Sequence, residues 1–240
     1  MYDFTNRNAL VTGAGKGIGR SIAIQLAKDN CNLLLVDINE DGLIETKQLL
    51  EKYKIDVVIK KLDIANEFEV YKTVNDYLST HNKIDILVNN ASIYHKHSGF
   101  RNCDMDEFRN KVNINIMGSV YMCKAVIENM IKNNYGRIIN LASVAGVYGD
   151  GNMTDYATTK GAIIAFTKSL AKEFSGMGIN VNAVSPGTIN VGSGDLPEHS
   201  FIGRSGSPEE CANLVVFLAS EQASYISGQN YLVDGCRRRM

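Results

Sequence analysis

Short apolar runs alternate with longer amphipathic stretches along the whole chain. The apolar runs predict strands at residues 9–13, 32–37, 57–63, 84–89, 137–142, 180–184 and 231–233. The stretches between them have helical periodicity near residues 18–29, 40–53, 67–80, 106–132, 156–174 and 208–219. Strands that read as continuous apolar runs, alternating with helices, are typical of a mostly parallel sheet covered on both faces. The pattern therefore predicts an α/β, doubly wound fold with a mostly parallel seven-stranded sheet and helices on both faces.

Length and composition indicate one domain over residues 1–240. The chain is 45% hydrophobic, and no linker, repeat or low-complexity tract divides it. Its 25 basic and 26 acidic residues nearly cancel, so we expect a small-molecule partner and no nucleic acid. No stretch is apolar enough to predict a membrane span or a signal peptide. The five scattered cysteines read as free thiols of a reducing compartment, so we expect a cytoplasmic protein.

A glycine-rich segment, TGAGKGIG at residues 12–19, follows the first predicted strand and opens a helix. Glycines there let the backbone approach a pyrophosphate, whose charge the helix N-terminus favours. This position is that of the dinucleotide-binding turn of a Rossmann fold, although Ile18 stands where G-x-G-x-x-G requires its last glycine. Asp37 ends the second strand, where a carboxylate accepts hydrogen bonds from an adenosine ribose. That carboxylate would repel a 2′-phosphate, so we expect NAD; Lys16 would partly offset the repulsion, which leaves NADP as the alternative.

A second set of polar residues suits acid–base chemistry. Ser143 follows the fifth strand, and Tyr156 and Lys160 stand one helical turn apart, so the ammonium shares a helix face with the phenol. A free tyrosine, with its pKa near 10, is a poor base at neutral pH. Nearby positive charge would stabilise the phenolate, and we expect it from Lys160, from an oxidised nicotinamide and from a helix N-terminus near Thr154.

The motifs T-G-x-x-x-G-x-G and Ser with Y-x-x-x-K, in this order, resemble those of the short-chain dehydrogenase/reductase family. The resemblance extends from Thr12 to Gly235. It implies an oxidoreductase that interconverts a secondary alcohol and a ketone, with Tyr156 as general acid/base, Ser143 bonding the substrate oxygen, Lys160 also holding the ribose and Asn115 holding a relay water. The cofactor positions that it implies, beside Tyr156 and Lys160, are Gly13, Gly17, Ile18, Gly19, Asp37, Asp63, Ile64, Asn89, Asn90, Ala91, Pro186, Gly187 and Ile189.

The chain departs from the family pattern at several of these positions. Ser92 and Cys236 replace glycines, and Val191 replaces a threonine that touches the carboxamide, so Thr188 or Asn190 would take over that contact. For Asp63, a role in a helix cap is as good an interpretation as adenine binding. The substrate lid near residues 191–203 is short and glycine-rich, so we expect no stable pair of lid helices.

Residues 93–105 and 147–154 should form the other pocket wall, with His95, Lys96, His97, Arg101 and Tyr148. These charges would suit a polar or anionic substrate, but solvated loops explain them equally well. His95 and His97 suggest a metal only weakly, since no third ligand is apparent.

The helical stretches 114–131 and 156–174 are apolar around much of their circumference, which predicts a homo-oligomer, most simply a tetramer. The resemblance, to the broad group of 3-oxoacyl-carrier-protein reductases and sugar or polyol dehydrogenases, does not choose the substrate or the direction. A non-catalytic dinucleotide-binding sensor or scaffold is the competing hypothesis.

Overall fold

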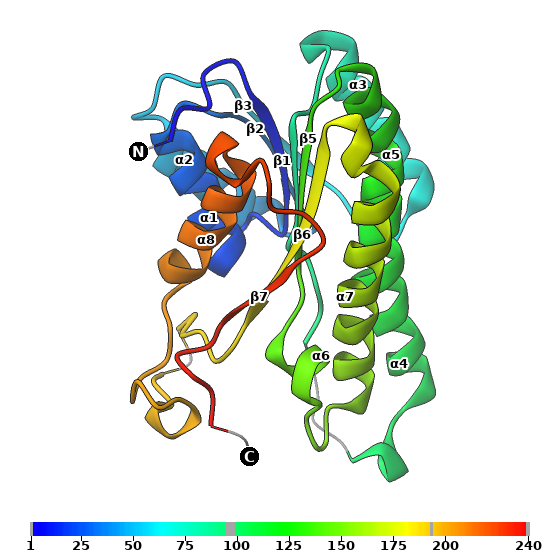
Figure 1. Cartoon of the computed structure of the whole chain (residues 1–240), viewed down its shortest axis with the longest axis vertical. Coiled ribbons are helices and arrows are strands. Elements are labelled where there is room, and N and C mark those ends of the chain that lie inside the picture. The colour runs from blue at the N-terminus through cyan, green and yellow to red at the C-terminus, as the bar shows by residue number, and fades with distance from the viewer. Residues whose placement is uncertain (1, 95–98, 193, 239–240) are drawn as a thin grey trace.

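The computed structural model describes residues 2–94, 99–192 and 194–238 (Figure 1). Its centre is one seven-stranded sheet in the order β3-β2-β1-β4-β5-β6-β7, with every neighbouring pair parallel. The strands are β1 Asn8–Thr12, β2 Asn32–Asp37, β3 Val57–Lys61, β4 Ile86–Asn89, β5 Gly136–Leu141, β6 Ile179–Pro186 and β7 Asn230–Val233. The predicted doubly wound fold is confirmed, and the strand order reverses between β1 and β4, where such sheets bind ligands.

Helices cover both faces of the sheet (Figure 1). Their bounds are α1 Gly17–Lys28, α2 Glu40–Leu50, α3 Glu67–His81, α4 Met105–Lys111, α5 Gly118–Lys132, α6 Val144–Tyr148, α7 Thr154–Phe174 and α8 Pro208–Ala219. One face carries α1, α2 and α8, and the other carries α3, α5 and α7. Within the described residues no helix is long and apolar enough to cross a membrane.

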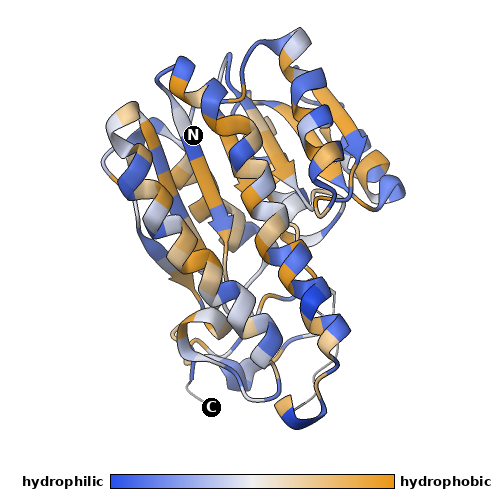
Figure 2. Ribbon diagram, turned by 90° about the vertical axis from the view of Figure 1, so that its right-hand side faces the viewer, coloured by the Kyte–Doolittle hydropathy of each residue, from blue (hydrophilic) through white to orange (hydrophobic). Residues whose placement is uncertain are grey.

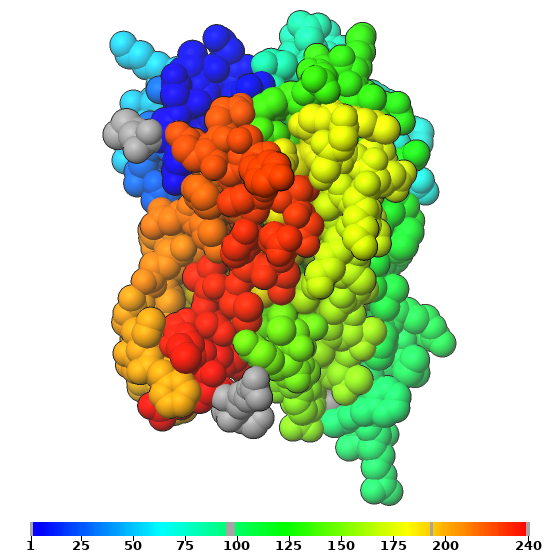
Figure 3. Space-filling model, in the orientation of Figure 1, coloured from blue at the N-terminus to red at the C-terminus, as the bar shows by residue number. Residues whose placement is uncertain are grey.

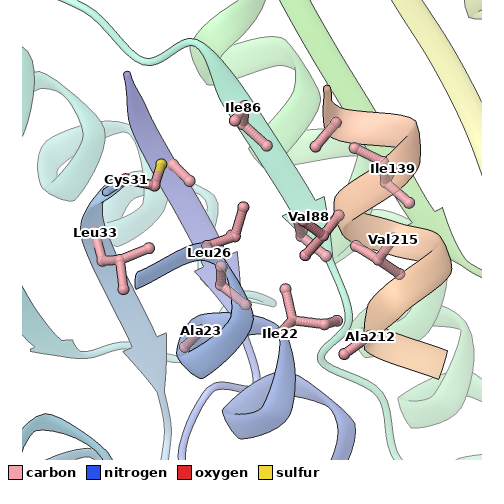
Figure 4. Packing of buried hydrophobic residues seen from close by; sticks show 14 of the residues in the cluster. Ile22, Ala23, Leu26, Cys31, Leu33, Ile86, Val88, Ile139, Ala212 and Val215 are labelled. Atoms are coloured by element: carbon pink, nitrogen blue, oxygen red, sulfur yellow. The ribbon is translucent and has the colours of Figure 1, made fainter. Parts of the chain in front are cut away.

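Each face of the sheet has its own hydrophobic core. On the α1 and α8 side, Ile22 and Leu26 of α1 pack with Val215 of α8 over Val88 and Ile139 of the sheet (Figure 4). The second core, between the sheet and α3, α5 and α7, includes Leu10, Leu87 and Met122. Figure 2 shows strands that are mostly hydrophobic and helices in which hydrophobic and hydrophilic residues are mixed. Each fully buried Leu or Ile contributes about 1.5–3 kcal/mol to the stability of the fold. Because helices cover both faces of the sheet, the strands are apolar along their whole length.

The structure differs from the predicted helices in two places. The periodic stretch 106–132 is interrupted by a π-helix, Val112–Met117, in which Gly118 N–H reaches back to the carbonyl of Asn113. Single π-helical turns inside α-helices are frequent at functional sites, and this one carries Asn115. The short helix α6 was not predicted, because its five residues are too few to show a periodicity.

Candidate active site

The glycine-rich loop is tightly wound between β1 and α1. Gly13 and Gly17 have φ of +65° and +56°, a region that glycine enters without steric cost. A Cβ on Gly19 would lie 2.1 Å from the Gly13 carbonyl oxygen, so only glycine fits there. Lys16 caps α1 without a side-chain hydrogen bond, and no acidic residue lies in the first turn. The first N–H groups of α1 therefore suit the anionic pyrophosphate of a dinucleotide.

Polar side chains from β2, α1 and α2 hold this loop from behind. Asp37 accepts a hydrogen bond from Gly15 N–H at 2.8 Å, and a Cβ on Gly15 would lie 2.9 Å from the same carboxylate oxygen. Arg20 donates to the Gly15 carbonyl and to the Thr46 hydroxyl, and Thr46 donates to the Ala14 carbonyl at 2.9 Å. The loop is thus preorganised, and Asp37 lies at the end of β2 as predicted. Sequence reasoning missed Arg20 and Thr46, because their contacts depend on how α1 and α2 pack.

The residues at the end of β4 point in two directions, some toward the glycine-rich loop and one into the interior. Asn90 donates to the carbonyls of Thr12 and Gly13 at 2.9 and 3.1 Å, while Thr12 Oγ1 accepts from the N–H groups of Asn90 and Ala91. Asn89 instead points inward, where it donates to Asn140 Oδ1 at 2.9 Å and lies only 4% exposed. The structure therefore brings Asn90 and Ala91 to the glycine-rich loop, but not the Asn89 side chain.

Asp63 and Ile64 follow β3. Asp63 is exposed, and its carboxylate accepts the Ala65 N–H at 2.9 Å, so it shapes the turn that leads into α3. Asp63 is not the cap of α3, because Asn66 holds that position and accepts the Glu69 N–H. Ile64 is buried, and its Cδ1 would lie 2.6 Å from a Cβ on Gly118. Its side chain therefore packs under α5.

Ser143, Tyr156 and Lys160 converge, as the sequence predicted. Ser143 caps α6, where its hydroxyl accepts Ala145 N–H at 3.2 Å, and this hydroxyl lies close enough to the Tyr156 phenol to lower the pKa of Tyr156. Lys160 is buried and donates from Nζ to the Leu141 carbonyl at 2.7 Å. Its ammonium lies 5.7 Å from the centre of the Tyr156 ring.

Burial dominates the ionisation of this group. Desolvation raises the pKa of Tyr156 to about 12, against the lowering by Ser143, and it lowers the pKa of Lys160 to about 8. The sequence-based expectation was that positive charge favours the phenolate. Burial acts in the other direction, because taking the phenolate charge out of water costs free energy. With its pKa raised in this way, the Tyr156 phenol keeps its proton at pH 7.

Asn115 is 1% exposed and ties three segments together. Its Oδ1 accepts Ile93 N–H at 2.8 Å, and its amide nitrogen donates to the Ile93 carbonyl and to Thr159 Oγ1, both at 3.1 Å. It lies next to α7, and these protein groups take up both hydrogens of its amide, while Oδ1 accepts one hydrogen bond.

The segment after β6 closes the site from below. Pro186 ends β6, and Gly187 packs so closely that a Cβ would lie 2.8 Å from the Cα of Asp234. Ile189 forms a bridge with Gly206. Of the two residues expected to replace the missing threonine, Thr188 instead shares a hydrogen bond with His199 at 2.9 Å, and Asn190 accepts Gly192 N–H. Val191, 59% exposed, faces Gly17 of the glycine-rich loop.

The lid has one 3-10 turn, Pro197–His199, and no pair of helices within its described residues, as expected. It is held by the C-terminal segment, since Phe201 and Ile202 N–H donate to the carbonyls of Cys236 and Gly235. Figure 3 shows these two segments, coloured orange and red, side by side at the end of the molecule where α6 lies. The sequence held no signal for this pairing.

The wall opposite the lid is built by Tyr94, which meets the Tyr156 ring edge-on at 5.0 Å between centroids, and by the exposed Tyr148. Arg101 lies in a 3-10 turn, Phe100–Asn102. His95, Lys96 and His97 lie outside the described residues, and the part of the chain that is described holds no cluster of metal ligands.

Comparison with known proteins gives this architecture a family. Residues 13–236 match a family model described as Enoyl-(Acyl carrier protein) reductase. The 3-oxoacyl-(acyl-carrier-protein) reductase FabG of Vibrio harveyi is 37% identical over 95% of each chain, and that of Chlamydia pneumoniae is 34% identical over 95% of this chain and 96% of its own.

Two solved structures are similarly close. An NAD+-bound xylitol dehydrogenase superposes with a TM-score of 0.92, at 32% identity, over 97% of this chain and 99% of its own. A levodione reductase gives 0.90, at 30% identity, over 97% of both chains. The chain belongs to the short-chain dehydrogenase/reductase family, and it is an oxidoreductase of that family, acting on CH–OH groups.

Proposed function

We propose that the protein interconverts a secondary alcohol and a ketone with NAD(H), and that Tyr156 is its general acid/base. The observation that carries the proposal is the meeting of the Tyr156 phenol with the Ser143 hydroxyl, with the buried Lys160 ammonium beside the same ring. These three groups stand next to the end of β5, near the reversal of strand order between β1 and β4.

In the reductive direction the neutral Tyr156 phenol donates its proton to the carbonyl oxygen of the substrate. The Ser143 hydroxyl donates a hydrogen bond to the same oxygen, where negative charge develops. NAD(H), when bound, supplies or accepts the hydride at the substrate carbon. The phenolate left on Tyr156 is stabilised by Lys160 and regains a proton from solvent. Oxidation runs through the same groups in reverse.

The residues around the glycine-rich loop fit a dinucleotide, because the glycines leave room for its phosphates and the N-terminus of α1 faces them. Asp37 supports NAD over NADP, since its carboxylate would accept hydrogen bonds from a ribose and repel a phosphate. The similar xylitol dehydrogenase holds NAD+ in its crystal structure, which is in keeping with this preference. Lys16 is the residue that would favour NADP.

Tyr156→Phe tests the mechanism. We expect turnover to fall by roughly 100- to 10,000-fold, the usual contribution of a general acid, with binding of NADH retained. Tyr225→Phe, which removes a hydroxyl from a fully exposed ring, is the matched control and should leave kcat unchanged. Both variants are assayed by NADH oxidation across a panel of ketones and sugars. Unchanged turnover in Tyr156→Phe would refute the mechanism.

The same panel tests the competing hypothesis. A sensor or scaffold would bind NADH but turn over nothing, in wild type and in both variants.

We also propose a cytoplasmic homotetramer. Its five cysteines are all free, which suits a reducing compartment. Several apolar side chains of α5 and α7 pack against the cores but stay only half-buried, among them Tyr121, Ile164 and Phe166. Two-fold pairing of these helices would bury such side chains in an isologous contact.

A further inference from the structure

An ion pair between Lys111 and Asp155 is buried at the back of the site. The two side chains are in direct contact and are 3% and 9% exposed. The other ion pairs between described residues each have a partner more than a tenth exposed, such as Arg137 with Glu221 (5% and 59%) or Arg7 with Asp85 (29% and 3%). Among the ion pairs between described residues, both charges are buried only in that of Lys111 and Asp155.

The pair joins the two chain segments that carry site residues. Lys111 is the last residue of α4 and runs straight into the π-helix that holds Asn115. Asp155 lies in the first turn of α7, directly before Tyr156, and its other carboxylate oxygen accepts the Tyr156 N–H at 2.7 Å. One carboxylate therefore contacts both the α4 ammonium and the backbone of the proposed general acid.

A second contact between the same segments lies one turn further along α7. There the Asn115 amide donates to Thr159 Oγ1 at 3.1 Å. The ion pair and this hydrogen bond together constrain the start of α7 against the π-helix, in distance and in rotation. Tyr156 lies between these two contacts.

Stability alone does not account for the charges. A buried ion pair repays its desolvation only with good geometry, and replacement by apolar residues of similar volume is often neutral or stabilising. A charged pair with a fixed hydrogen-bond geometry is more specific than an apolar contact, because it allows few alternative arrangements of the two segments.

We propose that Lys111 and Asp155 are positioning residues, which set the Tyr156 phenol against the substrate and Asn115. The proposal rests on the proposed role of Tyr156 as general acid/base. A misplacement of about 1 Å in a reacting group costs as much as 100-fold in rate, so loss of the pair should act on kcat.

The test is the double variant Lys111→Met/Asp155→Leu, which replaces the charges by apolar groups and leaves no buried charge unpaired. The single variant Lys111→Met strands the Asp155 carboxylate and is expected to fold less stably. The matched control is Lys72→Met/Asp76→Leu, which removes an exposed i, i+4 pair on α3. Each variant is assayed at a temperature where urea titration shows it fully folded.

For the double variant we expect kcat to fall 10- to 100-fold with little change in KM for NADH, whereas the α3 control keeps wild-type kcat. A second readout does not need turnover. Protein labelled with 13C at the tyrosine Cζ, with Tyr156 assigned from Tyr156→Phe, reports ionisation of the phenol by NMR. In the double variant the pKa of Tyr156 should move from its raised value toward 10, because a loosened α7 start admits water.

Wild-type kcat together with an unmoved Tyr156 titration in the double variant would overturn the positioning role. If wild type itself turns over no substrate, the proposed function fails, and the NMR titration still decides the question. A moved Tyr156 titration then supports the positioning role, and an unmoved one refutes it.

Discussion

Asp37→Ala is the perturbation that tests cofactor choice most directly. The carboxylate lies at the end of β2, half-buried, with one oxygen 2.8 Å from Gly15 N and the other 2.9 Å from Asn39 N. Each oxygen can accept a second hydrogen bond, so a ribose can be bound without breaking these contacts. A hydrogen bond to a charged group contributes about 1.5–3 kcal/mol, and its loss should weaken NADH by roughly 10- to 150-fold.

The same substitution removes a repulsion from NADPH. Two unit charges about 4 Å apart near a protein surface interact by about 4 kcal/mol, and at a half-exposed carboxylate screening by salt reduces this to about 1–2 kcal/mol. Loss of the hydrogen bond to Gly15 weakens the binding of both cofactors equally, so this effect cancels when their kcat/KM values are compared. The ratio of kcat/KM for NADH over NADPH should therefore fall by about 100-fold or more.

The assay is the rate of reduction of one ketone with each cofactor in turn. Asp41→Ala, which removes an exposed charge from the first turn of α2, is the control for a general change of charge and should leave the ratio near its wild-type value. A wild type that prefers NADPH would refute the role given to Asp37. An equal change of the ratio in the two variants would do so as well.

Three further outcomes follow from the structure. Gly19→Ala should abolish measurable NADH binding by fluorescence, because the new Cβ would meet the Gly13 carbonyl at 2.1 Å; binding at wild-type strength would mean that the loop is not the cofactor site. Because the pKa of Lys160 is lowered to about 8, the folded state loses this proton before the unfolded state does, and its contribution to stability rises between pH 8 and 10.5. The free energy of unfolding of wild type, compared with that of Lys160→Met, should therefore increase by up to about 1.4 kcal/mol per pH unit in this range. Urea titrations that give the same difference between the two proteins at pH 8 and at pH 10 would contradict this prediction. Light scattering should give a mass near four chains of 26.4 kDa, and a fully active monomer at micromolar concentration would exclude the oligomer.

Much of the fold follows from local pattern. Strands buried on both faces must be apolar throughout, so all seven strands were predicted within about two residues at each end. The motif residues were equally visible, because Gly13 and Gly17 adopt a backbone conformation that favours glycine, and Tyr156 and Lys160 share a helix face through their spacing. These properties depend on near neighbours in the chain, which a sequence displays.

Tertiary structure alone decided the environment of those residues. It turned Asn89 inward, inserted a π-helix at Asn115 and placed Lys111 against Asp155, residues far apart in the chain. It also buried the phenol of Tyr156, and this burial raises the pKa of Tyr156. Burial and charge balance arise from contacts between distant segments, and the order of residues along the chain does not contain those contacts in readable form.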